Sequence, residues 1–115
     1  MHLFHEVSQS CSKIITEQYS TSFSGAIRLL HKDLRAHIHN IYGFVRFADE
    51  IVDTFHGFDK AALLAQFMKD TYAAIHTGIS LNPILHSFQI TVNTYAIDPK
   101  LFNAFFKSMQ LDLEK

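Results

Sequence analysis

The chain has 115 residues, of which 48% are apolar, so it is long enough for one small globular domain and is neither a disordered nor a fibrous protein. Its formal net charge of −1 disfavours nucleic acid as a partner, because nucleic-acid binding needs a basic face. No apolar run reaches the roughly 20 residues of a membrane-spanning helix, and the first ten residues do not form a secretory signal. We therefore expect a cytoplasmic protein, with a peripheral membrane contact left open.

Apolar residues recur at helical spacing along the whole chain and no stretch alternates strictly, so the sequence predicts an all-α fold. The first helix is expected over residues 5–18. It ends in a hydroxyl-rich stretch at 19–24, because such side chains favour caps and turns over helix interiors. A short helix is expected to follow at about 25–30.

A long helix is predicted next. Asp33 is its expected N-cap, the helix runs to about Phe55, and Gly57 closes it. Its apolar stripe, which we expect to face the bundle, consists of Ile38, Ile41, Val45 and Val52.

Three further helices complete the predicted fold, over residues 60–76, from Pro83 to about Tyr95, and from Pro99 onward. Gly78 is the expected stop of the first of them. The inner side of that helix is predicted to carry Leu63, Leu64, Phe67, Met68, Ala74 and Ile75. The last helix shows no stop signal before the chain ends, so we expect residues 1–115 to form a single partial domain, truncated at its C-terminus.

Four chemically suited side chains share one side of the long helix. Tyr42, Arg46, Asp49 and Asp53 are spaced 4, 3 and 4 apart, which places them within a wedge about 60° wide. The wedge borders the predicted apolar stripe. Residues that line a cavity are expected in that position.

Carboxylates at i and i+4 lie about 5–6 Å apart at Cβ, and each can give one oxygen to a Mg²⁺ ion that keeps its other positions for water and phosphate. Arg46 could contact a phosphate oxygen through its planar guanidinium. Spacing alone leaves other interpretations open. The acids could belong to a solvated helix face, Arg46 could pair with Asp49 or Glu50 within the helix, and Tyr42 could be a core aromatic with its hydroxyl at the rim.

The eight histidines and the single cysteine suggest no second site. His37 and His39 are about 200° apart on a helix and cannot chelate one metal together. The other histidines are scattered in sequence, and surface or partly buried positions are expected for them. Cys11 excludes an intramolecular disulfide, favours a reducing compartment, and is expected to be a buried structural thiol rather than a nucleophile.

Three segments resemble the squalene/phytoene synthase family. Residues 19–23 (Tyr-Ser-Thr-Ser-Phe) are similar to its Ser-x-Ser-Phe segment, and residues 42–53 are similar to its Tyr-x-x-x-Arg-x-x-Asp-[Asp/Glu]-x-x-Asp helix. Residues 109–113 (Met-Gln-Leu-Asp-Leu) resemble a Met-x-Met-Asp-Leu stretch found further along. The order and separation of the segments agree as well. The resemblance therefore covers nearly the whole chain.

The resemblance implies the N-terminal part of an all-α isoprenoid-synthase helical bundle with a large central cavity. Members of the family join two allylic isoprenyl diphosphates head to head (1′–1) with loss of diphosphate. By this resemblance, Asp49 and Asp53 would bind Mg²⁺, or Mn²⁺ in its place. Ser20, Ser22 and Arg46 would contact the diphosphate, Tyr42 would line the reaction chamber, and Phe23 would flank the hydrocarbon chain.

Within the family, the wording of residues 42–53 looks closest to bacterial phytoene synthases, which use geranylgeranyl diphosphate. A squalene or dehydrosqualene synthase that uses farnesyl diphosphate is the first alternative, and NADPH would be needed only for squalene formation. A non-catalytic helical interaction or assembly protein is the second. A peripheral membrane contact for product release and any oligomeric state stay open.

The sequence also departs from the family pattern. Many relatives carry a second basic residue where this chain has Phe47. The second aspartate-rich motif of the family lies beyond residue 115, so we expect the 115-residue chain alone to be inactive.

Overall fold

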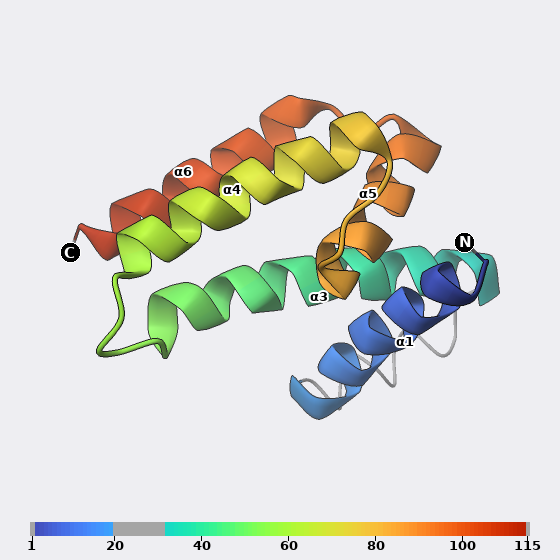
Figure 1. Cartoon of the computed structure of the whole chain (residues 1–115), viewed down its shortest axis with the longest axis horizontal. Helices are drawn as coiled ribbons and strands as arrows, with labels where there is room; N and C mark the ends of the chain where they lie inside the picture. Colours follow the sequence, from blue (N-terminus) through green and yellow to red (C-terminus); the bar gives the residue numbers. More distant parts are fainter. Residues whose placement is uncertain (1, 20–31, 115) are drawn as a thin grey trace.

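The computed structural model describes residues 2–19 and 32–114, and every regular element in these two stretches is a helix (Figure 1). The helices are α1 (His2–Tyr19), α3 (Lys32–Asp53), α4 (Lys60–Thr77), α5 (Pro83–Tyr95) and α6 (Pro99–Leu113). The predicted all-α class is confirmed. The short helix predicted at 25–30 lies outside the described residues.

Side chains cap the N-terminal ends of α4, α5 and α6, and Gly78 ends α4 as predicted. Asn82 and Asp98 accept hydrogen bonds from backbone N–H groups of the first turn of α5 and α6, and proline occupies the start of each helix. Asp59 caps α4 in the same way, at 3.0 Å from the N–H of Ala62. At the other end of α4, Gly78 has φ +77° and donates its N–H to Ala74 at 2.8 Å.

The long helix α3 begins at Lys32, so Asp33 lies inside it rather than at its N-cap. It ends at Asp53, two residues before the predicted Phe55. The Nζ of Lys60 donates to the carbonyl oxygen of Val52 at 2.7 Å, which satisfies one of the carbonyl groups that a helix C-terminus leaves unpaired.

The chain arranges α4 and α6 side by side, with α3 running beneath them and α1 packed against α3 and α5 (Figure 1). Phe44 of α3 lies at the centre of the core and is 2% exposed. Its ring stacks on Phe88 of α5 at 3.8 Å between centroids and on Phe67 of α4 at 5.5 Å. The ring of Phe106 from α6 meets it edge-on at 5.7 Å. One aromatic side chain therefore joins four helices.

The buried face of α3 differs from the predicted apolar stripe. The apolar residues of α3 that are 3% exposed or less are Phe44, Ala48 and Ile51, whereas Ile41 is 39% exposed. On a helical wheel the predicted stripe is centred about 90° away from the observed one. The cluster of phenylalanines on α4, α5 and α6 covers this side of α3. Phe44, Ala48 and Ile51 also follow helical spacing, so the sequence of α3 contains two candidate stripes and the packing selects one of them.

Helix α1 buries small hydroxyl side chains and exposes some of its apolar ones, the reverse of a usual amphipathic helix. Ser8, Ser12 and Thr16 are 0% exposed, whereas Val7 and Ile14 are 49% and 59% exposed. The predicted burial of Cys11 is wrong, because its side chain is only partly covered.

The reason for this orientation is close packing against α3. A Cβ added at Gly43 would lie 3.2 Å from the Cβ of Ser12, so only small side chains fit between the two helices. The Oγ atoms of Ser12 and Ser87 are 2.6 Å apart, and this hydrogen bond satisfies two buried hydroxyl groups between α1 and α5.

The prediction for the inner side of α4 is largely confirmed. Leu64, Phe67 and Ala74 are buried, and Met68 and Ile75 pack partly against the core. The prediction is wrong for Leu63, whose side chain is 39% exposed.

None of the described helices is both long enough and apolar enough to cross a membrane.

Candidate functional site

The candidate site lies on the side of α3 that faces away from the phenylalanine core. Tyr42, Arg46 and Asp49 are half-buried there, and Asp53, the last residue of the helix, is exposed. The prediction that this wedge borders the buried face is wrong, because the wedge is about 170° from Phe44 on a helical wheel. The four side chains nevertheless share one side of one rigid helix.

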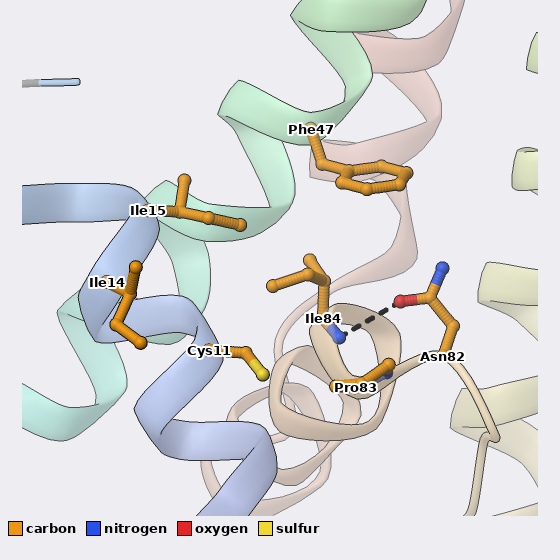
Figure 2. A pocket seen from close by; sticks show the side chains of 7 residues that line it. All are labelled: Cys11, Ile14, Ile15, Phe47, Asn82, Pro83 and Ile84. Carbon is orange, nitrogen blue, oxygen red and sulfur yellow. Dashed lines mark hydrogen bonds between the residues drawn. The ribbon is translucent and has the colours of Figure 1, made fainter. Parts of the chain in front are cut away.

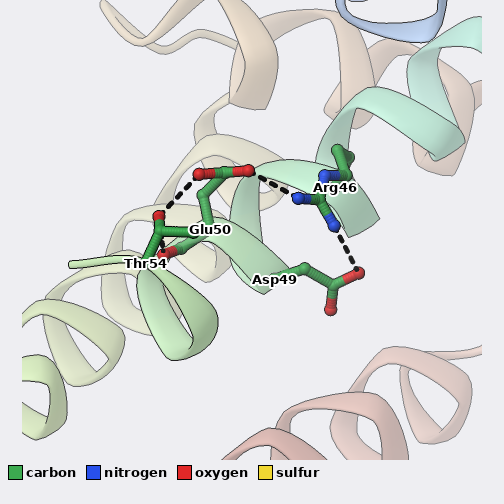
Figure 3. Close-up of polar contacts among 4 residues, drawn as sticks. All are labelled: Arg46, Asp49, Glu50 and Thr54. Carbon is green, nitrogen blue, oxygen red and sulfur yellow. Dashed lines mark hydrogen bonds and ion pairs between the residues drawn. The ribbon is translucent and has the colours of Figure 1, made fainter. Parts of the chain in front are cut away.

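Arg46 forms ion pairs with two acids of the same helix (Figure 3). Its Nη2 donates to Oε1 of Glu50 at 2.6 Å, and its Nη1 lies 3.9 Å from Oδ2 of Asp49. The second oxygen of Glu50, Oε2, accepts a hydrogen bond from the hydroxyl of Thr54 at 2.6 Å. The guanidinium is therefore held firmly on the Glu50 side and loosely on the Asp49 side.

The environment of Asp49 disfavours a negative charge. Burial raises the pKa of this carboxyl above its usual value of 3.8, the guanidinium of Arg46 acts in the opposite direction, and the charges of Asp53, Asp112 and Glu50 raise it further. Asp112 lies on α6, within the segment that resembles the family's Met-x-Met-Asp-Leu stretch. The charge of Asp112, on another helix, thus adds to the effect of the two acids of α3 on Asp49.

A divalent cation would suit this arrangement, since it would neutralise acids that now repel one another. Asp49 and Asp53 could each supply one oxygen. In the described part of the chain, no three His, Cys, Asp or Glu side chains come together in a way that could hold a metal ion. The pair would therefore leave most positions of an octahedral Mg²⁺ ion to water and phosphate oxygens, as Mg²⁺ commonly requires.

The other predicted substrate contacts, Ser20, Ser22 and Phe23, lie outside the described residues. Of the predicted site residues, the structure thus places Tyr42, Arg46, Asp49 and Asp53.

An apolar pocket of about 550 Å³ lies elsewhere, between α1, α3 and the start of α5 (Figure 2). It is lined by Cys11, Ile14, Ile15, Phe47, Asn82, Pro83 and Ile84. Phe47 also stacks on Phe67 at 5.4 Å, so the position where many relatives carry a basic residue is here part of an apolar wall. Tyr42, Arg46, Asp49 and Asp53, the predicted site residues that the structure describes, are not among the residues that line this pocket. The described part of the candidate diphosphate site is therefore separate from it.

The histidines form no metal site in the described residues, but two of them meet. Nδ1 of His5 lies 2.6 Å from Nε2 of His86, which is 0% exposed, and the two rings stack. The other ring nitrogen of His86, Nδ1, accepts the backbone N–H of Ser80 at 3.2 Å. This pair is 81 positions apart in sequence, and no sequence pattern predicted it.

Sequence reasoning also missed the role of Thr54. The available signal was its position four residues after Glu50, the spacing at which helical side chains meet. The predicted alternative in which Arg46 pairs with Asp49 or Glu50 within the helix is confirmed for both acids.

Comparison with known proteins adds evidence that is independent of this geometry. The family model described as squalene/phytoene synthase matches residues 16–115. Presqualene diphosphate synthase from Rhodopseudomonas palustris is 28% identical over 94 residues, which cover 82% of this chain and 33% of the relative. The chain thus spans about a third of the length of this curated relative. No solved structure matches the chain significantly.

Proposed function

This chain belongs to the squalene/phytoene synthase family, and we propose that its helix α3 supplies one side of a Mg²⁺-dependent diphosphate site. The reaction proposed for a protein with this site is the head-to-head condensation of two allylic isoprenyl diphosphates with loss of diphosphate. The observation that carries the proposal is the presence of Asp49, Asp53 and Arg46 on one side of a helix within the matched region.

Each side chain has a definite task in this proposal. Asp49 and Asp53 would hold Mg²⁺, or Mn²⁺, which neutralises the departing diphosphate. Arg46 would contact a diphosphate oxygen through Nη1, the nitrogen that lies on the side of Asp49 in the structure. Tyr42 would line the chamber beside the reacting carbons.

The substrate length is a further part of the proposal. We favour geranylgeranyl diphosphate and phytoene, on the wording of residues 42–53. The similarity to a presqualene diphosphate synthase favours the squalene branch with farnesyl diphosphate, in which NADPH would serve only a reductive step. NMR titrations of the chain with unreactive C15 and C20 thiolodiphosphates would show which chain length binds more tightly.

The metal site can be tested directly with Mn²⁺ as a paramagnetic probe. Mn²⁺ should broaden the backbone amide signals near Asp49 and Asp53, and an excess of Mg²⁺ should restore them. The Asp49→Asn/Asp53→Asn double variant should lose the effect. Asp70→Asn is the matched control, because Asp70 is an exposed helical acid on α4.

The broadening should be stronger when inorganic diphosphate is present, because the anion supplies ligands that the protein lacks. Broadening that is equal in the wild-type chain and the double variant would contradict the proposal. That result would favour the non-catalytic interaction protein.

A further inference from the structure

Glu50 differs from the two neighbouring acids in how its oxygens are used. Oε1 accepts from Nη2 of Arg46 at 2.6 Å, and Oε2 accepts from the hydroxyl of Thr54 at 2.6 Å (Figure 3). Both distances are typical of strong, charge-assisted hydrogen bonds. A carboxylate engaged in this way is oriented toward Arg46 rather than toward a shared metal ion.

The helix places these groups in a fixed order around its axis. Relative to Arg46, Glu50 is rotated by about 40° in one direction and Asp49 by about 60° in the other. Glu50 therefore holds one nitrogen of the guanidinium, and the other nitrogen is left on the side of Asp49, at 3.9 Å. The proposed Mg²⁺ and diphosphate would bind on that same side.

Thr54 is the first residue after the last turn of α3, and its hydroxyl reaches back by one turn. The oxygen lies 2.6 Å from Oε2 of Glu50 and 2.9 Å from the backbone carbonyl oxygen of the same residue. The hydroxyl has one proton, and the charged carboxylate is the stronger acceptor. Thr54 thus restricts the rotamer of Glu50, and Glu50 restricts that of Arg46.

From this chain of contacts we infer that Glu50 and Thr54 are positioning residues that hold Arg46 in place to receive a diphosphate group, and that Glu50 is not a metal ligand. The inference rests on the proposed function of Asp49, Asp53 and Arg46. An arginine held in advance loses less side-chain freedom when the anion binds, so the pair raises affinity for the diphosphate and not for the metal alone.

The test compares variants of the whole 115-residue chain in ¹H–¹⁵N NMR titrations, first with MgCl₂ alone and then with inorganic diphosphate at constant Mg²⁺. Thr54→Val removes the hydroxyl and keeps the shape of the side chain. It should weaken diphosphate binding by about 3- to 10-fold and change Mg²⁺ binding by less than about 2-fold. Thr54→Ser should restore the wild-type diphosphate affinity.

Glu50→Gln should behave like Thr54→Val, because a neutral amide oxygen holds the guanidinium of Arg46 less firmly than the carboxylate does. Asp49→Asn should instead weaken Mg²⁺ binding itself. Thr94→Val is the matched control, since the hydroxyl of Thr94 also bonds a carbonyl four residues earlier but contacts no carboxylate in any hydrogen bond that the structure describes.

The order of the Arg46 side chain gives a readout that needs no ligand. The heteronuclear NOE of its Nε–H group should fall in Thr54→Val and stay unchanged in Thr94→Val. A mere loss of helix stability would not produce this difference.

The possible results separate the two proposals. If the wild-type chain binds no Mg²⁺–diphosphate, the proposed function fails, and this inference fails with it. If the wild-type chain and Thr54→Val bind diphosphate equally well, only this inference is overturned. A loss of Mg²⁺ binding in Glu50→Gln as large as that in Asp49→Asn would make Glu50 a metal ligand, and would also overturn it.

Discussion

The side chains of the candidate site are arranged for binding rather than for stability. Asp49 is half-buried next to three other acids, and burial raises the pKa of its carboxyl group. The carboxyl of Asp49 therefore holds its proton more tightly in the native state than in the unfolded chain. The native state loses stability as the pH rises from 3.8 through the raised pKa of Asp49. A carboxylate kept at such a cost is typical of a functional site.

Asp49→Asn should therefore stabilise the chain at pH 7. We expect the Tm to rise by roughly 2–4 °C in the absence of metal, as measured by circular dichroism. Well below pH 3.8, the usual pKa of the group, the difference in Tm between wild type and variant should disappear, because the carboxyl is then neutral in both states. A variant that is less stable than wild type at pH 7 would show that the pair with Arg46 outweighs burial.

His86 predicts a second pH effect, of the opposite sign. Burial, and then the charge of His5, lower the pKa of this imidazole below 6.5. The unfolded chain therefore takes up a proton below pH 6.5 that the native state does not accept, and stability is lost as the pH falls toward the native pKa. The contribution is at most about 1.4 kcal/mol per pH unit.

His86→Gln should reduce the slope of the unfolding free energy against pH between pH 7.5 and 5.5, measured by urea denaturation. His39, whose pKa is also lowered by burial, should account for part of the remaining slope. His76→Gln is the control, because that side chain is exposed in the last turn of α4. An unchanged slope in His86→Gln would show that the imidazole takes up its proton equally in both states.

At the scale of helices, the contact between α1 and α3 depends on small side chains. Ser8, Ser12 and Thr16 follow one another at four-residue intervals and are all buried. The hydroxyl of Thr16 donates a hydrogen bond to the backbone carbonyl of Ser12 at 2.9 Å, so this buried hydroxyl has a partner within the helix. The close approach leaves no room for larger groups, and it leaves Val7 and Ile14 of α1 exposed.

Ser12→Val should destabilise the fold by about 2–4 kcal/mol, because it removes the hydrogen bond to Ser87 and adds volume next to Gly43. Ser12→Ala should cost only about 1–2 kcal/mol, since it removes the bond but adds nothing. Ser10→Ala, on the exposed side of the same helix, should stay within about 0.5 kcal/mol of wild type. Urea unfolding measures all three, and equal costs for Ser12→Val and Ser12→Ala would contradict the packing argument.

At the scale of the whole molecule, the phenylalanine core holds α3, α4, α5 and α6 together. Phe44→Ala should cost about 3–5 kcal/mol, a large share of the roughly 5–15 kcal/mol that stabilises an ordinary domain. Phe58→Ala is the control, since Phe58 is 72% exposed and should have an effect within about 0.5 kcal/mol. The m-value in urea would show whether the Phe44 variant unfolds in one step.

The chain alone should not turn over substrate. It spans about a third of its curated relative, and the described residues supply one pair of acids rather than two opposed ones. Incubation with geranylgeranyl or farnesyl diphosphate and Mg²⁺ should release no diphosphate above the Asp49→Asn/Asp53→Asn background. Measurable release by the wild-type chain would show that one side of the site is sufficient.

Local interactions explain why so much of the fold could be predicted. Asn82, Asp98 and Gly78 form caps with neighbours a few residues away, so helix ends can be read from the sequence. The arrangement of the site could also be predicted from the sequence. Any α-helix over these residues places Tyr42, Arg46, Asp49 and Asp53 on one side, whichever side of the helix is buried.

What only the tertiary structure decided is which side of α1 and of α3 is buried and which distant groups meet. The face of α3 that carries Phe44 is buried because phenylalanines of three other helices pack against it. The serines of α1 are buried because α1 packs closely against α3 at Gly43. The meeting of His5 with His86 has the same origin. Sequence by itself determined the helices, their ends and the chemistry of the wedge, because those depend on neighbours along the chain. Burial and long-range contacts depend on how helices pack, and packing energies are shared among residues far apart in sequence.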